Sequence, residues 1–277
     1  MLSFLGDTNV SKIKALVNEH KLLYRLHDIG WRGFINRSGL REFKNKYKGE
    51  RVFIVGNGPS LNKHDLSLLN GEYSFAVNGI FYKTREVGYK PTFYVVEDRH
   101  VAGDNVDDIN AYDVDYKFFP CDYKSMFKRN KNTFFYTMDK GYYHKSSPFF
   151  SMPRFSCDAN DVLYCGQSVT MINIQLAAYM GFSEVYLIGM DHNYVLPDDA
   201  DVNGEEITSN SDDPNHFHPD YFGKGKKWHD PHLDRVERSY QYMKTSLEAR
   251  GIKVFNATHG GKLEVFERID YRGLFNR

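Results

Sequence analysis

The sequence is poor in cysteine, which argues against a disulfide framework and against a zinc site. Cys121, Cys157 and Cys165 are the three cysteines among 277 residues. The count is odd, and the spacing of the last two fits no common zinc-binding pattern. Since hydrophobic residues make up 41% of the chain, a full core can form without disulfides. We therefore expect buried thiols in a reducing cytoplasm.

The chain also lacks an excess of either charge and lacks long apolar runs. Lys+Arg and Asp+Glu both number 36, so the formal net charge is zero. A duplex nucleic-acid partner is disfavoured because such binders usually carry a basic excess. Residues 1–7 lack the basic start of a signal peptide, and no apolar stretch approaches the length of a membrane span. These absences favour a cytoplasmic protein.

Two familiar phosphate-binding motifs are missing from the most informative stretch of the chain. The apolar run Val52–Val55 predicts a buried parallel strand, and it is followed by the sequence Gly-Asn-Gly-Pro-Ser over Gly56–Ser60. A dinucleotide fingerprint would need a third glycine at Leu61, and no Gly-Lys-Ser/Thr follows. Glycines at a strand end still allow a tight turn and close approach of a ligand.

Further strands and helices alternate along the chain. Strands are predicted at 74–78, 92–96, 116–119, 133–136, 184–191 and 253–256, and helices at 65–69, 168–180 and 233–250. Gly181 is expected to end the second of these helices. This alternation predicts an α/β fold, Rossmann-like and doubly wound, with a mostly parallel sheet. We expect one domain at 51–277, with a long lid at about 192–230.

Residues 1–50 are predicted to form an N-terminal helical extension. Apolar residues recur at helical spacing between Ile13 and Leu26. The segment is expected to be a lid, an arm of a homo-oligomer or a packing helix. The segment also contains basic and aromatic residues such as Lys21, Arg25 and Trp31. These residues are compatible with peripheral contact with the inner face of the membrane. A solvated helical face is the preferred interpretation.

Polar residues follow several predicted strands at the point where each strand ends. Asn57, Asn78 and Asp191 are three of these residues. In a parallel sheet, the carboxyl ends of the strands meet at one edge, where ligands bind in open α/β folds. This clustering predicts one binding site.

The segment 192–230 is long, polar and without periodicity. It contains His192, His216, His218 and His229, together with tyrosines, lysines and Trp228. A loop of this length in a compact domain is usually functional or disordered, and its composition favours a lid over an anionic substrate. Disorder fits residues 197–213 better than 217–228, where aromatic residues would be left in water. Metal binding by the histidines is disfavoured, because no second ligand pair has the right spacing.

Several of these motifs together resemble a known superfamily. Gly-Asn-Gly-Pro-Ser-Leu, Val-Asn-Gly-Ile-Phe-Tyr at Val77–Tyr82, a helix starting near Ser168 and Gly-x-Asp at Gly189–Asp191 follow one another in order. They resemble the bacterial sialyltransferases of glycosyltransferase family 42, the related domain of motility accessory factors, and 6-hydroxymethylpterin diphosphokinase-like proteins. The resemblance runs from about Arg51 to about Phe275.

The resemblance implies an activity and a set of site residues. Family 42 enzymes transfer a sialic acid from a CMP-sugar to a glycan hydroxyl by an inverting, metal-independent reaction, as in surface polysaccharide synthesis. The implied catalytic base is His229, five residues before Asp234. The implied partners are a CMP-sugar co-substrate and a glycan or lipid-linked acceptor, with no other cofactor. The residues assigned to nucleotide and donor binding are Gly56, Asn57, Gly58, Ser60, Asn78, Glu97, Gln167, Ser168, Asp191, Tyr194 and Tyr221.

Two other functions remain open on the sequence alone. A pterin pyrophosphokinase would need ATP and Mg²⁺, and the carboxylates of Glu97, Asp98 and Asp191 at strand ends would suit that metal. A nucleotide-binding module without chemistry would leave His229 dispensable. The family pattern also has an asparagine after the third strand, where this chain has Glu97 or Asp98.

Overall fold

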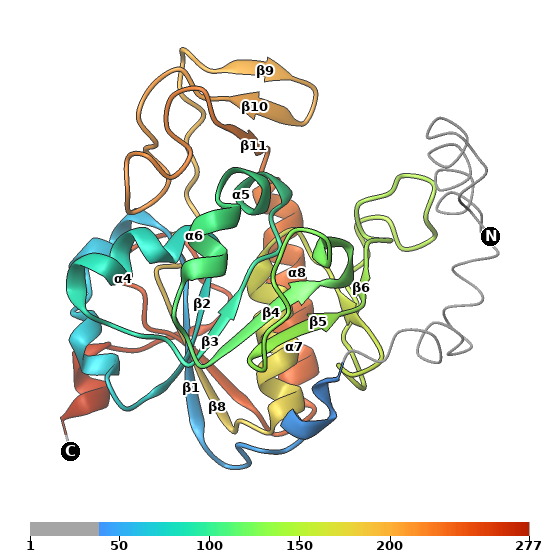
Figure 1. Ribbon diagram of the computed structural model, residues 1–277. Coiled ribbons are helices and arrows are strands. Elements are labelled where there is room, and N and C mark those ends of the chain that lie inside the picture. The colour runs from blue at the N-terminus through green and yellow to red at the C-terminus, as the bar shows by residue number, and fades with distance from the viewer. Residues whose placement is uncertain (1–38, 277) are drawn as a thin grey trace.

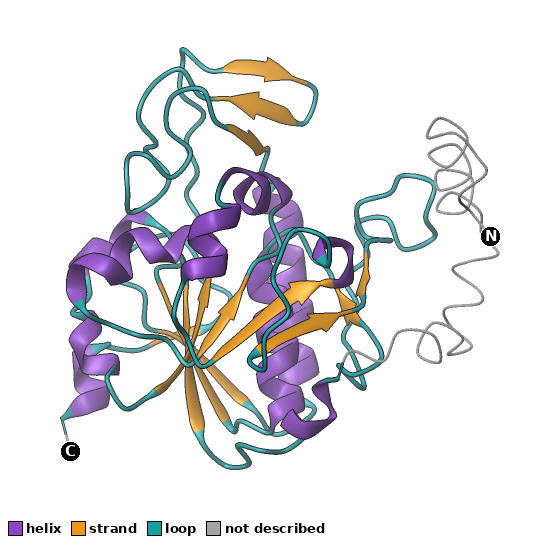
Figure 2. Cartoon of the chain, in the orientation of Figure 1, coloured by secondary structure: helices purple, strands orange, loops and turns teal. Residues whose placement is uncertain are grey.

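The computed structural model describes residues 39–276 as a parallel sheet between two layers of helices (Figures 1 and 2). The sheet has eight strands in the order β13-β12-β8-β1-β2-β3-β4-β5, and every neighbouring pair is parallel. This confirms the predicted Rossmann-like α/β fold. The strands of the sheet are β1 (Arg51–Val55), β2 (Tyr73–Val77), β3 (Phe93–Val95), β4 (Tyr116–Pro120), β5 (Thr133–Tyr136), β8 (Glu184–Ile188), β12 (Lys253–Asn256) and β13 (Glu267–Arg268).

Alternate residues of each strand enter the two helical layers. In β1, Val52 and Ile54 join the core on one face, and Phe53 and Val55 join the core on the other. The first face is covered by α7 (Val169–Met180) and α8 (Leu233–Glu248). The second is covered by α4 (Phe81–Val87), α5 (Arg99–Asp104) and α6 (Val106–Ala111). Burial on both faces explains why the strands read as continuous apolar runs.

The chain reverses its direction across the sheet beside β1. From β1 it proceeds through β2 to β5 on one side, and it then crosses back to place β8 and β12 on the other side. The carboxyl ends of β1 and β8 therefore border the topological switch point, where open α/β sheets bind ligands. This order places the predicted Gly-Asn-Gly turn and Asp191 next to each other.

Helix α7 begins and ends where the sequence predicts. The Ser168 side chain accepts a hydrogen bond from the Thr170 N–H, as an N-cap does. Gly181 ends the helix with a left-handed φ of 89°. Nearly the whole of α7 is buried, because it packs between the sheet, α8 and the turn at Leu40–Phe43.

Short elements account for most of what the sequence did not predict. Helices α4, α5 and α6 each span seven residues or fewer, and β6 (Met138–Asp139) pairs with β7 (Leu163–Tyr164) in a two-residue ladder. Segments this short carry no readable periodicity. The predicted helix at 65–69 is a 3-10 turn, Leu66–Leu69, capped by Asp65. The remaining 3-10 turns are Pro59–Lys63, Asn78–Ile80, Cys121–Tyr123 and Arg272–Phe275.

The lid between β8 and α8 forms a small sheet of its own. Strands β9 (Asp201–Asn203), β10 (Glu206–Thr208) and β11 (Lys227–His229) are antiparallel and stand above the carboxyl edge of the main sheet (Figure 1). The disorder interpretation for 197–213 is therefore wrong, because this segment holds the β9–β10 hairpin. The aromatic residues of the lid are buried as expected, among them Phe217, Tyr221, Phe222 and Trp228.

Three further expectations concern the N-terminal helices, the burial of the cysteines and membrane spans. The helices predicted between Ile13 and Leu26 lie outside the described residues, whereas Leu40 and Phe43 are fully buried in the main core. Cys165 is buried, but Cys157 is exposed, so the expectation of three buried thiols is wrong. Cys157 lies in the irregular connection between β6 and β7, where no periodic pattern indicates burial. Within residues 39–276, no helix has the length and apolarity needed to span a bilayer.

Candidate active site at the carboxyl edge of the sheet

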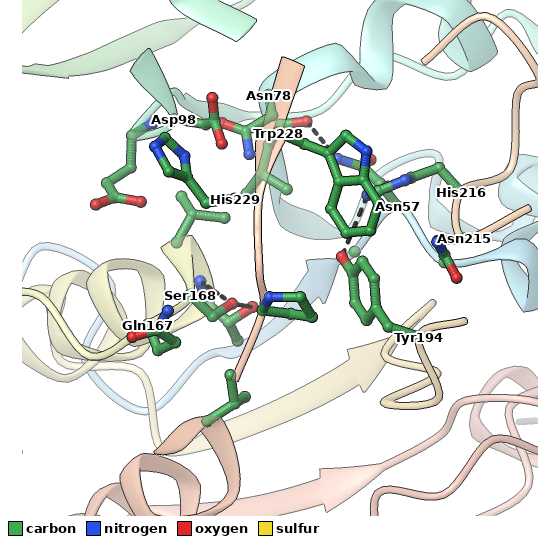
Figure 3. Close-up of a pocket in the computed structure, with 18 of the residues that line it drawn as sticks. Asn57, Asn78, Asp98, Gln167, Ser168, Tyr194, Asn215, His216, Trp228 and His229 are labelled. Atoms are coloured by element: carbon green, nitrogen blue, oxygen red, sulfur yellow. Dashed lines mark hydrogen bonds between the residues drawn. The ribbon is translucent and has the colours of Figure 1, made fainter. Parts of the chain in front are cut away.

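A pocket of about 440 Å³ lies where the carboxyl ends of the strands meet the lid. Its floor comes from the turns after β1, β2, β3 and β8, one side comes from the start of α7, and the lid closes over it (Figure 3). All but one of the residues assigned from the sequence line it: Gly56, Asn57, Gly58, Asn78, Glu97, Gln167, Ser168, Asp191, Tyr194, Tyr221 and His229. The topology thus brings together residues that are up to 173 positions apart, from Gly56 to His229.

Ser60 is the exception, since it supports the pocket from behind. Its Oγ donates a hydrogen bond of 2.6 Å to Asp191 Oδ2, and its N–H lies 3.1 Å from Asp191 Oδ1. Ser60 itself is buried. Its effect on the pocket is therefore to fix the Asp191 carboxylate.

The glycines after β1 avoid steric clashes with the turn after β8. A Cβ on Gly56 would lie 2.5 Å from the Gly189 carbonyl oxygen, and one on Gly58 would lie 1.9 Å from Asp191 Oδ2. Neither residue has a left-handed backbone. The tight turn predicted from the sequence is thus not the reason for these glycines. They are required by the close approach of the β1 turn to the β8 turn.

Asn57 presents one unpaired acceptor inside the pocket wall. Its Nδ2 donates to the Val77 carbonyl oxygen at 3.0 Å and to the Tyr221 hydroxyl at 2.9 Å. Its Oδ1 has no hydrogen-bond partner although the residue is only 8% exposed. An unpaired buried acceptor is costly, so this atom is suited to accept a hydrogen bond from a ligand.

Unusual backbone conformations gather around the same pocket. Six described residues other than glycine have positive φ, and three of them, Asn78, Gln167 and His192, line the pocket. Such conformations are costly for residues with a side chain and cluster at functional sites. Gln167 also buries an unpaired Oε1 directly before the N-cap of α7. The adjoining N–H groups of that helix favour an anionic ligand.

The lid contributes a buried network of hydrogen bonds on one side of the pocket. Asp213 Oδ2 accepts from His216 Nδ1 at 2.7 Å and from the Phe222 N–H at 2.9 Å. Burial alone would raise the pKa of Asp213, but these bonds, with one from the Asn215 N–H, outweigh it and lower the pKa. The His216 ring stacks flat on Tyr221 with centroids 4.0 Å apart. The lid is also joined to the β1 turn, because the Phe217 N–H donates to the Asn57 carbonyl oxygen at 2.9 Å.

His229 lies on the opposite side of the pocket from His216 (Figure 3). It is the last residue of β11 and is exposed, with its ring centroid 4.7 Å from that of His100. Glu206 is its partner in the β10–β11 ladder. Asp234 lies in the first turn of α8, close to the predicted helix start. An exposed imidazole at the edge of a pocket can exchange a proton with a bound hydroxyl.

Glu97 has the most perturbed carboxyl group of the pocket. Burial, and to a smaller extent the Asp98 carboxylate, raises its pKa from 4.5 to about 7. The Tyr143 hydroxyl donates to Glu97 Oε1 at 3.3 Å, and the Tyr123 hydroxyl donates to the Glu97 carbonyl oxygen at 2.7 Å. The folded protein therefore favours the protonated form of this acid.

Replacing Glu97 by glutamine should stabilise the protein at high pH only. Because the pKa of Glu97 is raised in the folded protein, its stabilising contribution to the free energy of unfolding is fully present below about pH 4.5. This contribution is lost as pH rises through about 7. We expect Glu97→Gln to unfold like the wild type at pH 5 and to be more stable by about 2 kcal/mol at pH 8. Thermal melts at both pH values measure this. Glu86→Gln, at an exposed glutamate, is the control and should show no such difference; equal shifts of the Glu97 variant at both pH values would contradict the prediction.

The other pocket carboxylates already have protein partners. Asp98 Oδ1 caps α5 by accepting from the His100 and Val101 N–H groups at 2.7 and 3.0 Å. Asp191 is held by Ser60. Within residues 39–276, no cluster of three or more histidine, cysteine or acidic side chains has the geometry to hold a metal ion.

Comparison with known proteins places the chain in a family. Residues 33–196 match the family model of 6-hydroxymethylpterin diphosphokinase MptE-like proteins. The chain belongs to the MptE-like family. The matched residues end near the beginning of the lid, before most of the lid and α8. A comparison with curated proteins finds no match to this MptE-like chain.

A solved structure with a similar arrangement is described as the MAf glycosyltransferase from Magnetospirillum magneticum AMB-1. The two are 15% identical, with a TM-score of 0.49. The alignment covers 89% of the MptE-like chain and 39% of the other protein. The chain described here thus spans about two fifths of the length of that protein.

Several pocket residues of this MptE-like protein were missed by the sequence reasoning. Lys140 and Tyr143 enter the pocket from the irregular connection between β6 and β7, and Arg99 enters from the first turn of α5. His216 was noted only as a disfavoured metal ligand. Its partner Asp213 lies three residues earlier, and an Asp-x-x-His spacing in a predicted lid is the signal that could have identified the pair.

Proposed function

We propose that the protein is a glycosyltransferase that moves a sialic acid-like sugar from a CMP-sugar to a hydroxyl group of a glycan or lipid-linked acceptor. The observation that carries this proposal is the composition of one pocket. An unpaired Asn57 acceptor, the N-terminus of α7 at Ser168 and the exposed His229 all line it. These groups suit a base or ribose, a phosphate and an acceptor hydroxyl, respectively.

The proposed reaction needs one proton acceptor and one site for developing negative charge. His229 takes the proton of the acceptor hydroxyl as its oxygen bonds to the anomeric carbon of the sugar. The bond from that carbon to the phosphate oxygen breaks, and CMP leaves with the electron pair. In this proposal, the phosphate is stabilised by Ser168, the N–H groups of α7 and the Tyr194 hydroxyl, all of which come from the pocket lining. The lid, with buried Trp228 and Phe222, limits access of water to the activated donor.

A pyrophosphokinase using ATP and Mg²⁺ is the alternative suggested by the family description. It would need oxygen ligands for the metal. Asp98 and Asp191 are engaged by backbone and serine donors, and Glu97 favours its protonated form. These side chains are less suited to a divalent cation than free carboxylates would be, which is why the glycosyltransferase is preferred. A nucleotide-binding module without chemistry is the third candidate.

A panel of nucleotides distinguishes the candidates. We expect CMP or CDP to raise the melting temperature without added metal, with UDP, GDP and ATP as comparisons in the presence and absence of Mg²⁺. A ligand at 100 times its dissociation constant adds about 2.7 kcal/mol to the free energy of unfolding. Stabilisation by ATP with Mg²⁺ alone would favour the pyrophosphokinase. Stabilisation by CMP with no turnover of any CMP-sugar would favour the binding module.

A further inference from the structure

In the lid, each ring nitrogen of His216 lies within hydrogen-bonding distance of a polar side chain. His216 Nδ1 lies 2.7 Å from Asp213 Oδ2, and His216 Nε2 lies 3.3 Å from the Tyr194 hydroxyl. The side chains of His216 and Asp213 are 7% and 3% exposed, whereas Tyr194 is 38% exposed. The series therefore leads from a buried carboxylate, through a buried imidazole, to a hydroxyl that lines the pocket.

The positions of the three residues are fixed by the surrounding lid. Asp213 accepts two backbone hydrogen bonds besides that from His216, so its carboxylate is anchored. The Asn215 side chain exchanges two hydrogen bonds with the backbone of Val195, at 2.7 and 2.8 Å. This pairing ties the residue after Tyr194 to the residue before His216. The stacking of His216 on Tyr221 fixes the plane of the imidazole.

The charge state of His216 decides what Tyr194 can offer a ligand. With Asp213 ionised, Nδ1 carries a proton in either state. In the neutral imidazole, Nε2 is an acceptor, and the Tyr194 hydroxyl directs its proton toward it. In the imidazolium, Nε2–H donates to the tyrosine oxygen, and the Tyr194 proton is released to point into the pocket. When His216 is protonated, the Tyr194 hydroxyl can therefore donate a hydrogen bond to an anion. The buried positive charge of the imidazolium strengthens that hydrogen bond.

We propose that protonated His216 orients the Tyr194 hydroxyl so that it donates a hydrogen bond to the phosphate group of a bound nucleotide. Phosphate binding and protonation of His216 are therefore coupled. His216 does not touch the ligand and is a positioning residue that acts through Tyr194. The inference rests on the proposed function in that the pocket takes a nucleotide, but it depends neither on His229 nor on the sugar. It also gives separate roles to two of the three histidines that line the pocket, with His216 at the phosphate and His229 at the acceptor.

Other charged and titratable groups face this cluster. Asp213 lies beside His216, and Tyr221 stacks on it. The carboxylates of Asp98 and Asp191 act electrostatically on Tyr194 from the strand ends. These two carboxylates disfavour the entry of a further negative charge into the pocket. Coupled proton uptake at His216 therefore offsets the charge of the arriving phosphate, and affinity for a ligand that carries a phosphate should fall as pH rises.

The test compares ligands with and without a phosphate at pH 6 and pH 8. CMP methyl ester is the main probe, because a phosphodiester does not titrate in this range, and cytidine is the uncharged reference. Isothermal titration calorimetry in two buffers of different ionisation enthalpy also gives the number of protons taken up. The variants are His216→Gln and Tyr194→Phe. His218→Gln is the matched control, since His218 stacks on Tyr82 and does not line the pocket.

The wild type should bind CMP methyl ester about tenfold more tightly at pH 6 than at pH 8, with proton uptake, whereas cytidine affinity should not change with pH. A charged hydrogen-bond partner has an effect of this size. His216→Gln and Tyr194→Phe should lose the pH dependence and bind at pH 6 as weakly as the wild type does at pH 8. His218→Gln should behave as the wild type.

An unchanged pH dependence in His216→Gln, or none in the wild type, would overturn the inference. Tyr194→Phe removes only a hydroxyl from a partly exposed side chain, so it keeps the test valid if the His216 variant does not fold. If cytidine ligands do not bind but the methyl ester of AMP or GMP does so with His216-dependent proton uptake, the proposed donor is wrong and the inference stands. Failure of every nucleotide to bind would contradict both.

Discussion

Replacing His229 by alanine should lower the rate of CMP release from a CMP-sugar donor by about 100-fold or more. This is the loss expected when a general base is removed. Nucleotide affinity should change little, because the imidazole is needed for the acceptor proton in the transition state and not for binding the base or phosphate. Steady-state kinetics, with CMP affinity measured by calorimetry on the same preparation, separate the two effects.

The matched control for this experiment is His218→Ala. His218 belongs to the same lid but lies outside the pocket, stacked on Tyr82 with ring centroids 5.0 Å apart. Its replacement should leave CMP release within about twofold of the wild type, as expected for a residue without a transition-state contact. Near-normal turnover of the His229 variant with a donor and acceptor that the wild type uses would disprove the assignment of the base.

Replacing Gly56 by alanine should destabilise the fold by about 1–3 kcal/mol, in the range of overpacking in a core. The added Cβ would meet the Gly189 carbonyl oxygen at 2.5 Å and Met190 Sδ at 2.7 Å. Backbone at the β1–β8 border cannot yield without breaking the bond from the Gly56 N–H to the Ile188 carbonyl oxygen. Urea denaturation measures the change in free energy of unfolding.

Gly103→Ala is the matched control for Gly56→Ala. Gly103 lies within α5, its φ is not in the left-handed region, and a Cβ there would meet nothing within 4 Å. Alanine should be neutral or stabilise the protein by up to about 1 kcal/mol, because it favours a helix over glycine. Equal stability of the two variants would show that the glycine after β1 is not required by packing.

The sequence was sufficient to predict the place of the pocket and every strand of the main sheet except the two-residue β13, because these depend on patterns local to the chain. The apolar run at Val52–Val55 and the cap residues Ser168 and Gly181 are examples, and the edge followed from parallel topology. The reason for Gly56 and Gly58 was not predictable. It depends on the distance between the turns after β1 and β8, residues more than 130 positions apart in the chain.

The remaining features depend on tertiary burial, which spacing does not encode. The raised pKa of Glu97 arises from the surroundings that enclose its carboxyl group. The Asp-x-x-His spacing can suggest that Asp213 pairs with His216, but it does not reveal that the pair is buried or that the Phe222 N–H bonds the same carboxylate. The β9–β10 hairpin is three residues per strand, too short for a reliable alternation of polar and apolar positions.

The attachment of the lid has a consequence for how such a site can diversify. The Phe217 N–H bonds the Asn57 carbonyl oxygen, and Asn62 Nδ2 returns a bond to the Phe217 carbonyl oxygen at 2.9 Å, so this part of the lid is continuous with the sheet. The β9 strand, by contrast, is exposed along its length. Changes in the hairpin can therefore accumulate without disturbing the hydrogen bonds between the lid and the segment after β1. The two parts of the lid can thus vary independently under selection.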